Sequence, residues 1–312
     1  MTVSVGEPQH PSDLAGAVFA ALAAEFFTSD GKPKIFELRD KRQTQDDPFD
    51  EHVGIVLNRR LPDRMRVYLS GKPLVSPDLV VARPQETRLL LRGGVDLDSS
   101  HIIGIEVKKL NYNQSRTGRA SGMDYNSTPP CSTVNIEADN GALLRIPAFY
   151  LYVILEPAPG SQYVVNSLAL VSGAILNEDV ELYEMITGIR QKVIGLGSYG
   201  DGLDRQRPML VFANPLGWPW LVGHATLLHV VQGIESEQDL VMRRRMYRTT
   251  RDGESREFFC YRMAGENPEG PEPDVTEPFP TPKNRKTETT QRGRFKISLA
   301  IVPRLPPESG RQ

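Results

Sequence analysis

Cysteine is scarce in this chain. Among 312 residues there are two cysteines, Cys131 and Cys260, far apart and without CxxC spacing. A disulfide framework or a zinc ribbon needs more cysteines or closer pairs. We therefore expect a cytoplasmic protein that folds around a hydrophobic core, which a chain of this length can bury without cross-links.

Long hydrophobic runs are also lacking. The N-terminus has neither the basic region nor the apolar region of a signal peptide. The apolar stretch at residues 14–27 is too short to span a bilayer and follows Asp13. We expect it to form an ordinary helix capped by Ser12 or Asp13, and we expect no membrane association.

An excess of charge of one sign is absent as well. The chain has 37 Lys and Arg residues against 39 Asp and Glu residues, which gives a net charge of -2. The whole-protein field therefore gives no indication of a polyanionic partner. Enzymes that release DNA often confine their basic charge to one cleft, so this balance does not exclude them.

Strand-like segments outnumber helical ones. Residues 178–194 have helical spacing, with acids in the first turn and cations in the last. Residues 32–63 are predicted to be polar and irregular. The pattern predicts a mixed α/β (α+β) chain, with strands at residues 65–69, 79–82, 87–91, 102–107, 132–138, 146–156, 163–172, 209–213 and 224–232.

The last fifth of the chain changes character. Residues 264–282 are rich in Pro and Glu, which predicts a long exposed loop or a disordered segment. Residues 283–312 form a basic C-terminal segment with a final strand expected at residues 295–302. Residues 1–263 would then form the main domain.

A group of chemically notable residues lies between residues 76 and 110. Pro77-Asp78 opens one apolar strand, and Glu106-Val107-Lys108 ends another. Side chains alternate along a strand, so Glu106 and Lys108 should share a face while Val107 points into the core. A carboxylate and an ammonium on a buried strand are costly unless they have a use.

That arrangement suits phosphodiester hydrolysis. Carboxylates of Asp78 and Glu106, with the backbone carbonyl of Val107, are the hard oxygen ligands that Mg²⁺ prefers. A metal held there could activate water and polarise a phosphate. Lys108 would act on the attacking water as general base or offset charge in the transition state.

Pro77-Asp78 … Glu106-Val107-Lys108 resembles the signature of the PD-(D/E)XK nuclease superfamily. The resemblance implies that those acids bind the metal and that the lysine is catalytic. It also implies a restriction-endonuclease-like fold, with a central mixed β-sheet flanked by helices and an N-terminal helix whose Glu25 reaches the metal site.

Type II restriction endonucleases are the members most similar in size. The resemblance therefore implies that residues 1–263 form a nuclease domain with DNA-recognition insertions. It further implies a homodimer that cuts double-stranded DNA at a specific site, and a cognate methyltransferase that protects host DNA.

Three alternatives stay open. Asp96 or Asp98, in the approach to the strand at residues 102–107, could replace Asp78 as the first metal ligand, and Asp98 is favoured if residues 87–91 pair directly with residues 102–107. The function could be that of a DNA repair or structure-specific nuclease of the same superfamily. The protein could also be a non-catalytic DNA-binding protein, in which Glu106 and Lys108 are an incidental pair on a solvent-facing edge strand.

Two further groups of residues are predicted to contact DNA, because arginine favours phosphate and guanine. One lies in a Gly/Ser/Asn-rich connection and the other in a basic run; together they are Arg116, Arg119, Asn126, Arg243, Arg244, Arg245 and Arg248. His224 and His229 are five residues apart, which does not suit metal ligands on a strand and predicts structural roles.

Overall fold

A computed structural model of the whole chain gives the structure of the protein. It describes residues 13–42, 47–70, 75–94, 96–111, 132–176, 198–199, 205–211, 215–235, 239–249, 253–266, 272–278, 283–290 and 293–300. The helices are α1 (Leu14–Phe26), α2 (Pro48–Arg60), α3 (Pro84–Gly93) and the short 3-10 helices η1 (Pro215–Gly217) and η2 (Pro219–Leu221).

The strands make up most of the regular structure. In chain order they are β1 (Ile35–Glu37), β2 (Arg66–Leu69), β3 (Val75–Ser76), β4 (Leu79–Ala82), β5 (Ile102–Asn111), β6 (Thr133–Ala138), β7 (Leu143–Ala158), β8 (Gln162–Ser172), β9 (Ser198–Tyr199), β10 (Arg205–Val211), β11 (Ala225–His229), β12 (Leu240–Thr249), β13 (Ser255–Met263), β14 (Val275–Thr276), β15 (Lys283–Thr290) and β16 (Gly293–Ile297).

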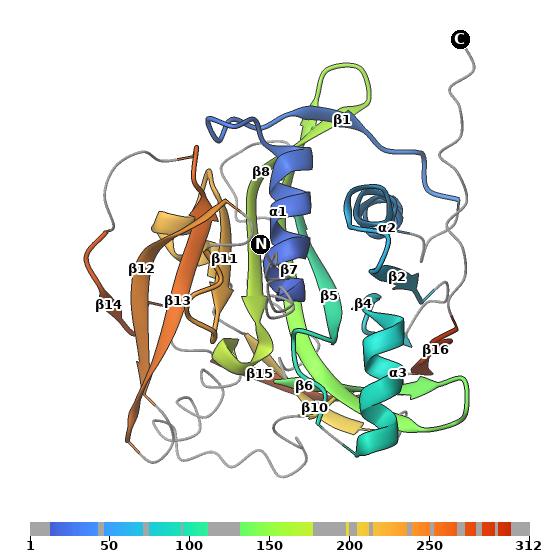
Figure 1. Cartoon of the computed structure of the whole chain (residues 1–312). Helices are drawn as coiled ribbons and strands as arrows, with labels where there is room; N and C mark the ends of the chain where they lie inside the picture. Colours follow the sequence, from blue (N-terminus) through green and yellow to red (C-terminus); the bar gives the residue numbers. More distant parts are fainter. Residues whose placement is uncertain are drawn as a thin grey trace, which may run out of the picture.

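A large mixed sheet organises the molecule (Figure 1). Its main path runs β14-β12-β13-β11-β8-β7-β5-β4-β2, while β1 pairs with β8 and β6 pairs with β7, β9 and β16. Strand β5 is antiparallel to β4 and parallel to β7. Strands β10 and β15 form a separate two-stranded sheet. The predicted mixed fold with more strand than helix is confirmed.

Two hydrophobic cores lie on opposite faces of this sheet. Helices α1 and α2 cover one face and pack on each other (Figure 1). The other face carries β6, η1, η2 and β16. Strand β7 contributes to both cores, with Leu151 and Val153 on the first face and Tyr150 and Tyr152 on the second. A strand buried on both sides reads as a continuous apolar run, as β7 does.

Two sequence predictions of local structure are wrong. Residues 87–91 belong to helix α3 and not to a strand. Pro84 occupies its first turn and Gly94, at φ 69°, ends it in the left-handed region, as proline and glycine commonly do at helix ends. Residues 32–63 contain helix α2, which begins after the cap Asp47. The helix predicted at residues 178–194 lies outside the described residues.

The other expected elements are present. The helix at residues 14–27 is α1, and its cap is Asp13. The final strand is β16, which pairs in parallel with β3 and β6 and so joins the main sheet. Within the described part of the chain, no helix is long and apolar enough to cross a membrane.

Asp13 joins three distant parts of the fold. Its carboxylate accepts hydrogen bonds from the backbone N–H groups of Ala15 and Gly16, at 2.8 and 3.1 Å, and from Ser99 Oγ at 2.6 Å. It also lies 3.2 Å from Nε2 of the buried His229 on β11. Burial acts to raise the pKa of Asp13, but His229, Ser99 and the helix N–H groups together lower it.

We expect Asp13→Ala to lower the free energy of unfolding by about 2–4 kcal/mol at neutral pH. The substitution removes the helix cap and leaves the buried groups that bind the carboxylate without a hydrogen-bond partner. Asp13→Asn should cost less, since asparagine also caps helices. The pKa of the Asp13 carboxyl group is lower in the folded protein than its value of 3.8 in the unfolded chain. Such a group stabilises the folded protein at a pH above 3.8, and this stabilisation is lost as the pH falls.

Urea unfolding of the wild type and Asp13→Asn from neutral pH to about pH 3 tests this expectation. The difference in the free energy of unfolding between the two proteins should become smaller below about pH 4. The exposed Asp40 offers a control, and Asp40→Asn should behave like the wild type at every pH. A gap that stays constant down to pH 3 would show that the ionised carboxylate contributes nothing.

Candidate active site

Strands β4 and β5 bring Asp78 and Glu106 together. Leu79 pairs with Ile105 in this antiparallel ladder, so Asp78 and Glu106 follow as opposite neighbours at its end. Glu106 is 5 % exposed although its side chain ends in a carboxyl group. Strand β5 lies between β4 and β7, so the alternative of a solvent-facing edge strand does not fit.

Both carboxylate oxygens of Glu106 have polar partners. The buried hydroxyl of Ser76 donates to Oε2 at 2.8 Å. Lys108 Nζ donates to Oε1 at 2.9 Å, as two side chains on one face of a strand can. These contacts compensate part of the cost of burying the charge. They also fix the direction in which the carboxylate faces.

Asp78 lies beside the same strand. Its Oδ2 accepts a hydrogen bond from the backbone N–H of Val107 at 2.8 Å. The N–H and C=O groups of one strand residue face the same neighbour, so the carbonyl of Val107 also faces the end of β4 where Asp78 lies. The side chain of Val107 points into the first core. The structure thus brings the four sequence-predicted residues together.

A third acid at the site, Asp50, was not identified from the sequence. It lies in the first turn of α2, close enough to Asp78 and Glu106 for their charges to interact. The signal that could have found it is Asp47-Pro48 followed by two acids, which is typical of a helix start. That signal lies in a region predicted to be irregular.

The expectation that Glu25 reaches the site is wrong. Glu25 Oε1 pairs with Arg59 at 2.7 Å, and Oε2 pairs with Arg60. Those arginines are in the last turn of α2, whereas Asp50 is in the first. Arg59 comes nine positions after Asp50 along the helix, a distance of about 14 Å at 1.5 Å per residue. Helix α2, rather than α1, therefore supplies the acid.

Helix α2 is tied to β5 by an ion pair. Lys109 Nζ lies 2.6 Å from both carboxylate oxygens of Asp47, the N-cap of α2. Because Lys108 and Lys109 are consecutive in a strand, they leave it on opposite faces. One lysine binds Glu106 while the other holds the helix that carries Asp50.

Burial and neighbouring acids disfavour the ionisation of Asp78 and Asp50. Burial, with the charges of Glu106 and Asp50, raises the pKa of Asp78 well above 3.8. Burial, with the charges of Asp47 and Glu106, raises the pKa of Asp50 to about 7. Lys108 opposes both shifts. Crowded carboxylates of this kind lose their mutual repulsion when a cation binds among them.

Asp98 lies away from this cluster. It accepts hydrogen bonds from the backbone N–H and the hydroxyl of Ser100 and pairs with His101 at 2.8 Å, which orders the turn before β5. Residues 87–91 are helical and β4 pairs directly with β5. The pairing that would have favoured Asp98 is therefore absent, and the hydrogen bond of Asp78 to β5 favours Asp78.

The predicted DNA-contacting arginines on β12 are engaged within the protein. Arg243 and Arg248 are buried, and Arg248 Nε lies 3.5 Å from Glu277. Arg245 pairs with Glu257 at 3.4 Å. Burial leaves Arg243 and Arg248 poorly placed to reach a phosphate. Arg116, Arg119 and Asn126 lie outside the described residues, so their role stays a prediction.

Arg244 is part of an aromatic cluster. Its guanidinium lies 4.5 Å from the ring centre of Trp220 and 5.4 Å from that of Trp218, and it pairs with Glu272 at 2.6 Å. Arg262 lies 4.0 Å from the Trp220 ring centre. Trp220 is thus in contact with two cations, an arrangement that stabilises this end of the sheet.

No group of three or more His, Cys, Asp or Glu side chains among the described residues is arranged as a ready metal site. Magnesium commonly binds through one or two carboxylates and keeps several waters. The residues that fit it here are Asp78, Glu106 and the carbonyl of Val107.

Comparison with known proteins gave no match to a family model, to a curated protein or to a solved structure.

We expect Asp50→Asn to stabilise the protein in a metal-free buffer. The pKa of the Asp50 carboxyl group is about 7 in the folded protein and 3.8 in the unfolded chain. Such a group destabilises the folded protein once the pH exceeds 3.8, and this loss of folding free energy grows until about pH 7. At pH 8 the variant should unfold with a free energy at least about 1 kcal/mol above that of the wild type.

The check is urea unfolding in EDTA at pH 4 and pH 8. At pH 4 the free energy of unfolding of Asp50→Asn should be close to that of the wild type. The control Asp40→Asn should have the wild-type free energy of unfolding at both pH values. An Asp50→Asn protein less stable than the wild type at pH 8 would contradict the crowding of acids described above.

Proposed function

We propose that the protein is a Mg²⁺-dependent endonuclease that hydrolyses phosphodiester bonds of double-stranded DNA. The observation that carries this proposal is the buried grouping of Asp78 with Glu106 and Lys108 where the ladder between β4 and β5 ends. A buried acid whose pKa is raised by burial and by a neighbouring carboxylate, as that of Asp78 is by Glu106, needs a function to justify its cost. The resemblance of their sequence to the PD-(D/E)XK signature supports the same conclusion.

Each residue has a role that its surroundings support. Asp78 and Glu106, with the Val107 carbonyl, would hold the metal, which supplies charge neutralisation at the scissile phosphate and acidifies water. Ser76 keeps the Glu106 carboxylate facing the site. Lys108, held 2.9 Å from Glu106, is placed to orient the attacking water and to offset charge on the phosphoryl oxygens.

Asp50 adds a third carboxylate. At neutral pH a carboxyl group with a pKa of about 7 is partly protonated, so it can accept or release a proton near the phosphate. We assign it a supporting role in positioning water at the metal. It takes the place that the resemblance gave to Glu25.

Within this reaction class we propose a type II restriction endonuclease that acts as a homodimer, because one site in each copy would cut each strand of a palindromic target. A methyltransferase that protects host DNA would be its companion. A repair or structure-specific nuclease is the alternative outcome, and the cleavage products distinguish the two.

The first experiment is digestion of unmethylated phage DNA with Mg²⁺ and, separately, with EDTA. We expect discrete fragments with Mg²⁺ alone. Smearing, or cutting of branched DNA alone, would support the repair alternative. Binding of DNA without cutting under any divalent metal would contradict the nuclease proposal.

The site assignment is tested with five variants. Glu106→Ala and Lys108→Ala should lower the cleavage rate by at least about a thousandfold while circular dichroism shows a folded protein. Asp50→Asn should cut measurably more slowly than the wild type. Glu25→Gln and the exposed Lys32→Ala serve as controls and should cut like the wild type. Loss of cutting in Glu25→Gln together with full activity in Asp50→Asn would reverse the assignment of the helix acid.

A further inference from the structure

Gly104 lies in β5 two residues before Glu106. It pairs with Val80 on β4, on the face of the sheet that packs against β6 and β16. A glycine inside a strand weakens the strand, and it commonly marks a place where another segment comes close to the backbone. The residue that comes close here is Pro77, immediately before Asp78.

Two stiff side chains fill the space beside Gly104. A Cβ atom at this position would lie 2.6 Å from Cγ1 of Val134 on β6 and 3.0 Å from Cγ of Pro77. Carbon atoms pack at about 3.5–4.0 Å, so a methyl group does not fit there. Valine branches at Cβ and proline is a closed ring, so neither side chain can rotate away at low cost. A larger residue at position 104 would therefore displace β6 or the segment around Pro77.

Pro77 lies between two residues that bind β5. Ser76 Oγ donates a hydrogen bond to Glu106 Oε2 at 2.8 Å. Asp78 Oδ2 accepts one from the backbone N–H of Val107 at 2.8 Å. Because three consecutive residues contact the same strand, a shift of the middle one lengthens the hydrogen bonds of both neighbours. The contact of the proline ring with the backbone of β5 thus sets how closely the two neighbours approach the site.

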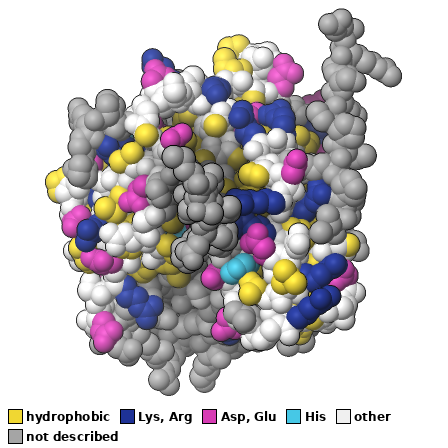
Figure 2. All heavy atoms as spheres, in the orientation of Figure 1, with side chains coloured by type: hydrophobic (Ala, Val, Ile, Leu, Met, Phe, Trp, Pro, Cys, Tyr) yellow, Lys and Arg dark blue, Asp and Glu magenta, His cyan; other side chains and the backbone are white. Residues whose placement is uncertain are grey.

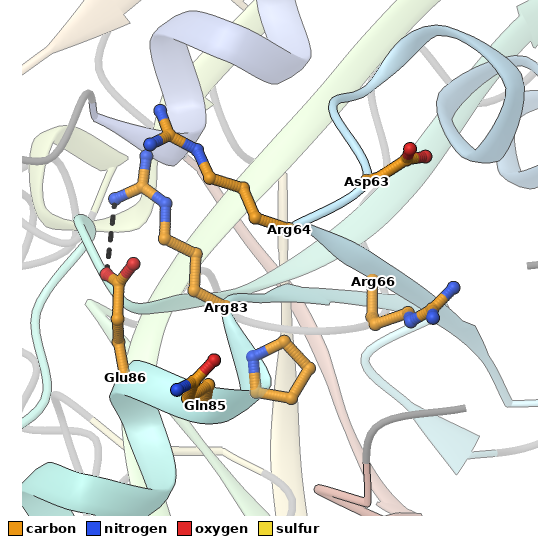
Figure 3. Close-up of a pocket in the computed structure, with 7 residues that line it drawn as sticks. Asp63, Arg64, Arg66, Arg83, Gln85 and Glu86 are labelled. Atoms are coloured by element: carbon orange, nitrogen blue, oxygen red, sulfur yellow. Dashed lines mark ion pairs between the residues drawn. The ribbon is translucent and has the colours of Figure 1, made fainter. Parts of the chain in front are cut away.

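The far end of β4 is fixed, so the strand cannot slide to absorb such a shift. Leu79–Ala82 are fully buried and pair with both β2 and β5. Next in the chain, Arg83 Nη1 donates a hydrogen bond to the backbone carbonyl of Ser100 at 2.5 Å and lies 3.8 Å from Glu86. Figure 3 shows Arg83 and Glu86 facing each other at this end of the strand. A displacement at the start of β4 would therefore remain there, next to the acids.

We propose that Gly104 is a positioning residue of the candidate active site: because it has no side chain, Pro77 lies directly against β5 and holds its two neighbours there. This inference rests on the proposed function, in which Asp78 and Glu106 act together at the scissile phosphate. A misplacement of reacting groups by about 1 Å can lower a rate a hundredfold. A small displacement of Pro77 is therefore enough to slow cleavage, although no charged group is removed.

Gly104→Ala is the direct test. We expect it to lower the DNA cleavage rate by about a hundredfold at a temperature where circular dichroism shows a folded protein. Its affinity for a fluorescein-labelled duplex in EDTA should equal that of the wild type. Gly104 is buried, and the charged side chains of the surface, seen on one face in Figure 2, stay as they are. An unchanged cleavage rate, or a fall in rate that only matches a loss of DNA affinity, would overturn the proposal.

A second substitution, Val134→Ala, separates this steric effect from a simple loss of stability. It removes the atom closest to the added methyl group, so Gly104→Ala/Val134→Ala should cut at least about tenfold faster than Gly104→Ala. Val134→Ala alone should cut like the wild type, although its cavity lowers stability. If Gly104→Ala acted through stability alone, the double variant would be the less stable and the slower of the two.

A double variant no faster than Gly104→Ala would overturn the proposal. If Gly104→Ala does not fold, the double variant decides the question. Recovery of a folded protein that cuts DNA would support the proposal, and failure to recover either would overturn it.

Hydrogen exchange gives a readout that does not depend on cleavage. The backbone N–H of Val107 donates to Asp78, so its exchange rate reports whether Asp78 stays on β5. We expect Gly104→Ala to speed this exchange by about tenfold, the effect of losing one hydrogen bond, and the double variant to restore it.

The matched control for hydrogen exchange is Gly265→Ala. Its added Cβ would lie 2.5 Å from the carbonyl oxygen of Ser29, in a turn after β13, which β11, β8 and β7 separate from β5. The exchange of the Val107 N–H should stay at the wild-type rate in this control. The expected exchange in a protein that does not cut DNA would contradict the proposed function and leave the positioning role standing. Unchanged exchange in Gly104→Ala, with cleavage by the wild type, would overturn the positioning role alone.

Discussion

The buried carboxylate of Glu106 constrains the structure around it more than any other group. It lies on β5, in the interior of the sheet, where an isolated charge would cost several kcal/mol. Ser76 and Lys108 each bind one of its oxygens. Ser76 is itself part of β3, which pairs with β16 near the end of the chain. Burial of one acid thus requires segments that are more than 200 residues apart in the sequence to meet.

The helices on the face into which Val107 points, α1 and α2, are fixed to the sheet by their caps. Asp13 caps α1 and also contacts His229 on β11, while Asp47 caps α2 and also binds Lys109 on β5. Each carboxylate therefore satisfies helix N–H groups and a sheet residue at once. Because the cap of α2 is bound to β5, the position of Asp50 relative to Glu106 follows from the same ion pair.

Sequence reasoning could identify Asp78, Glu106 and Lys108 because their geometry is local. One antiparallel pair of strands brings the first two opposite each other, and strand alternation places the third. Asp50 comes from a separate helix, and no spacing rule connects it to that pair. The mixed sheet could be predicted from its apolar runs, but the leucine-rich run at residues 87–91 contains no β-branched residue beyond Thr87, and leucine favours helix.

The arginines of β12 show a second limit. A run of basic residues in a sequence suggests a charged surface, yet here its partners lie in the Pro/Glu-rich region that was predicted to be exposed. Glu272 and Glu277 pair with Arg244 and Arg248, and β14 adds a strand beside β12. Such pairing depends on the tertiary fold, and a local sequence pattern does not predict it.

This internal neutralisation bears on how a chain with a net charge of -2 could hold DNA. Arginines that pair with acids inside the fold add little to the electrostatic potential at the protein surface. A run of basic residues in the sequence therefore suggests a more positive surface than the folded protein has.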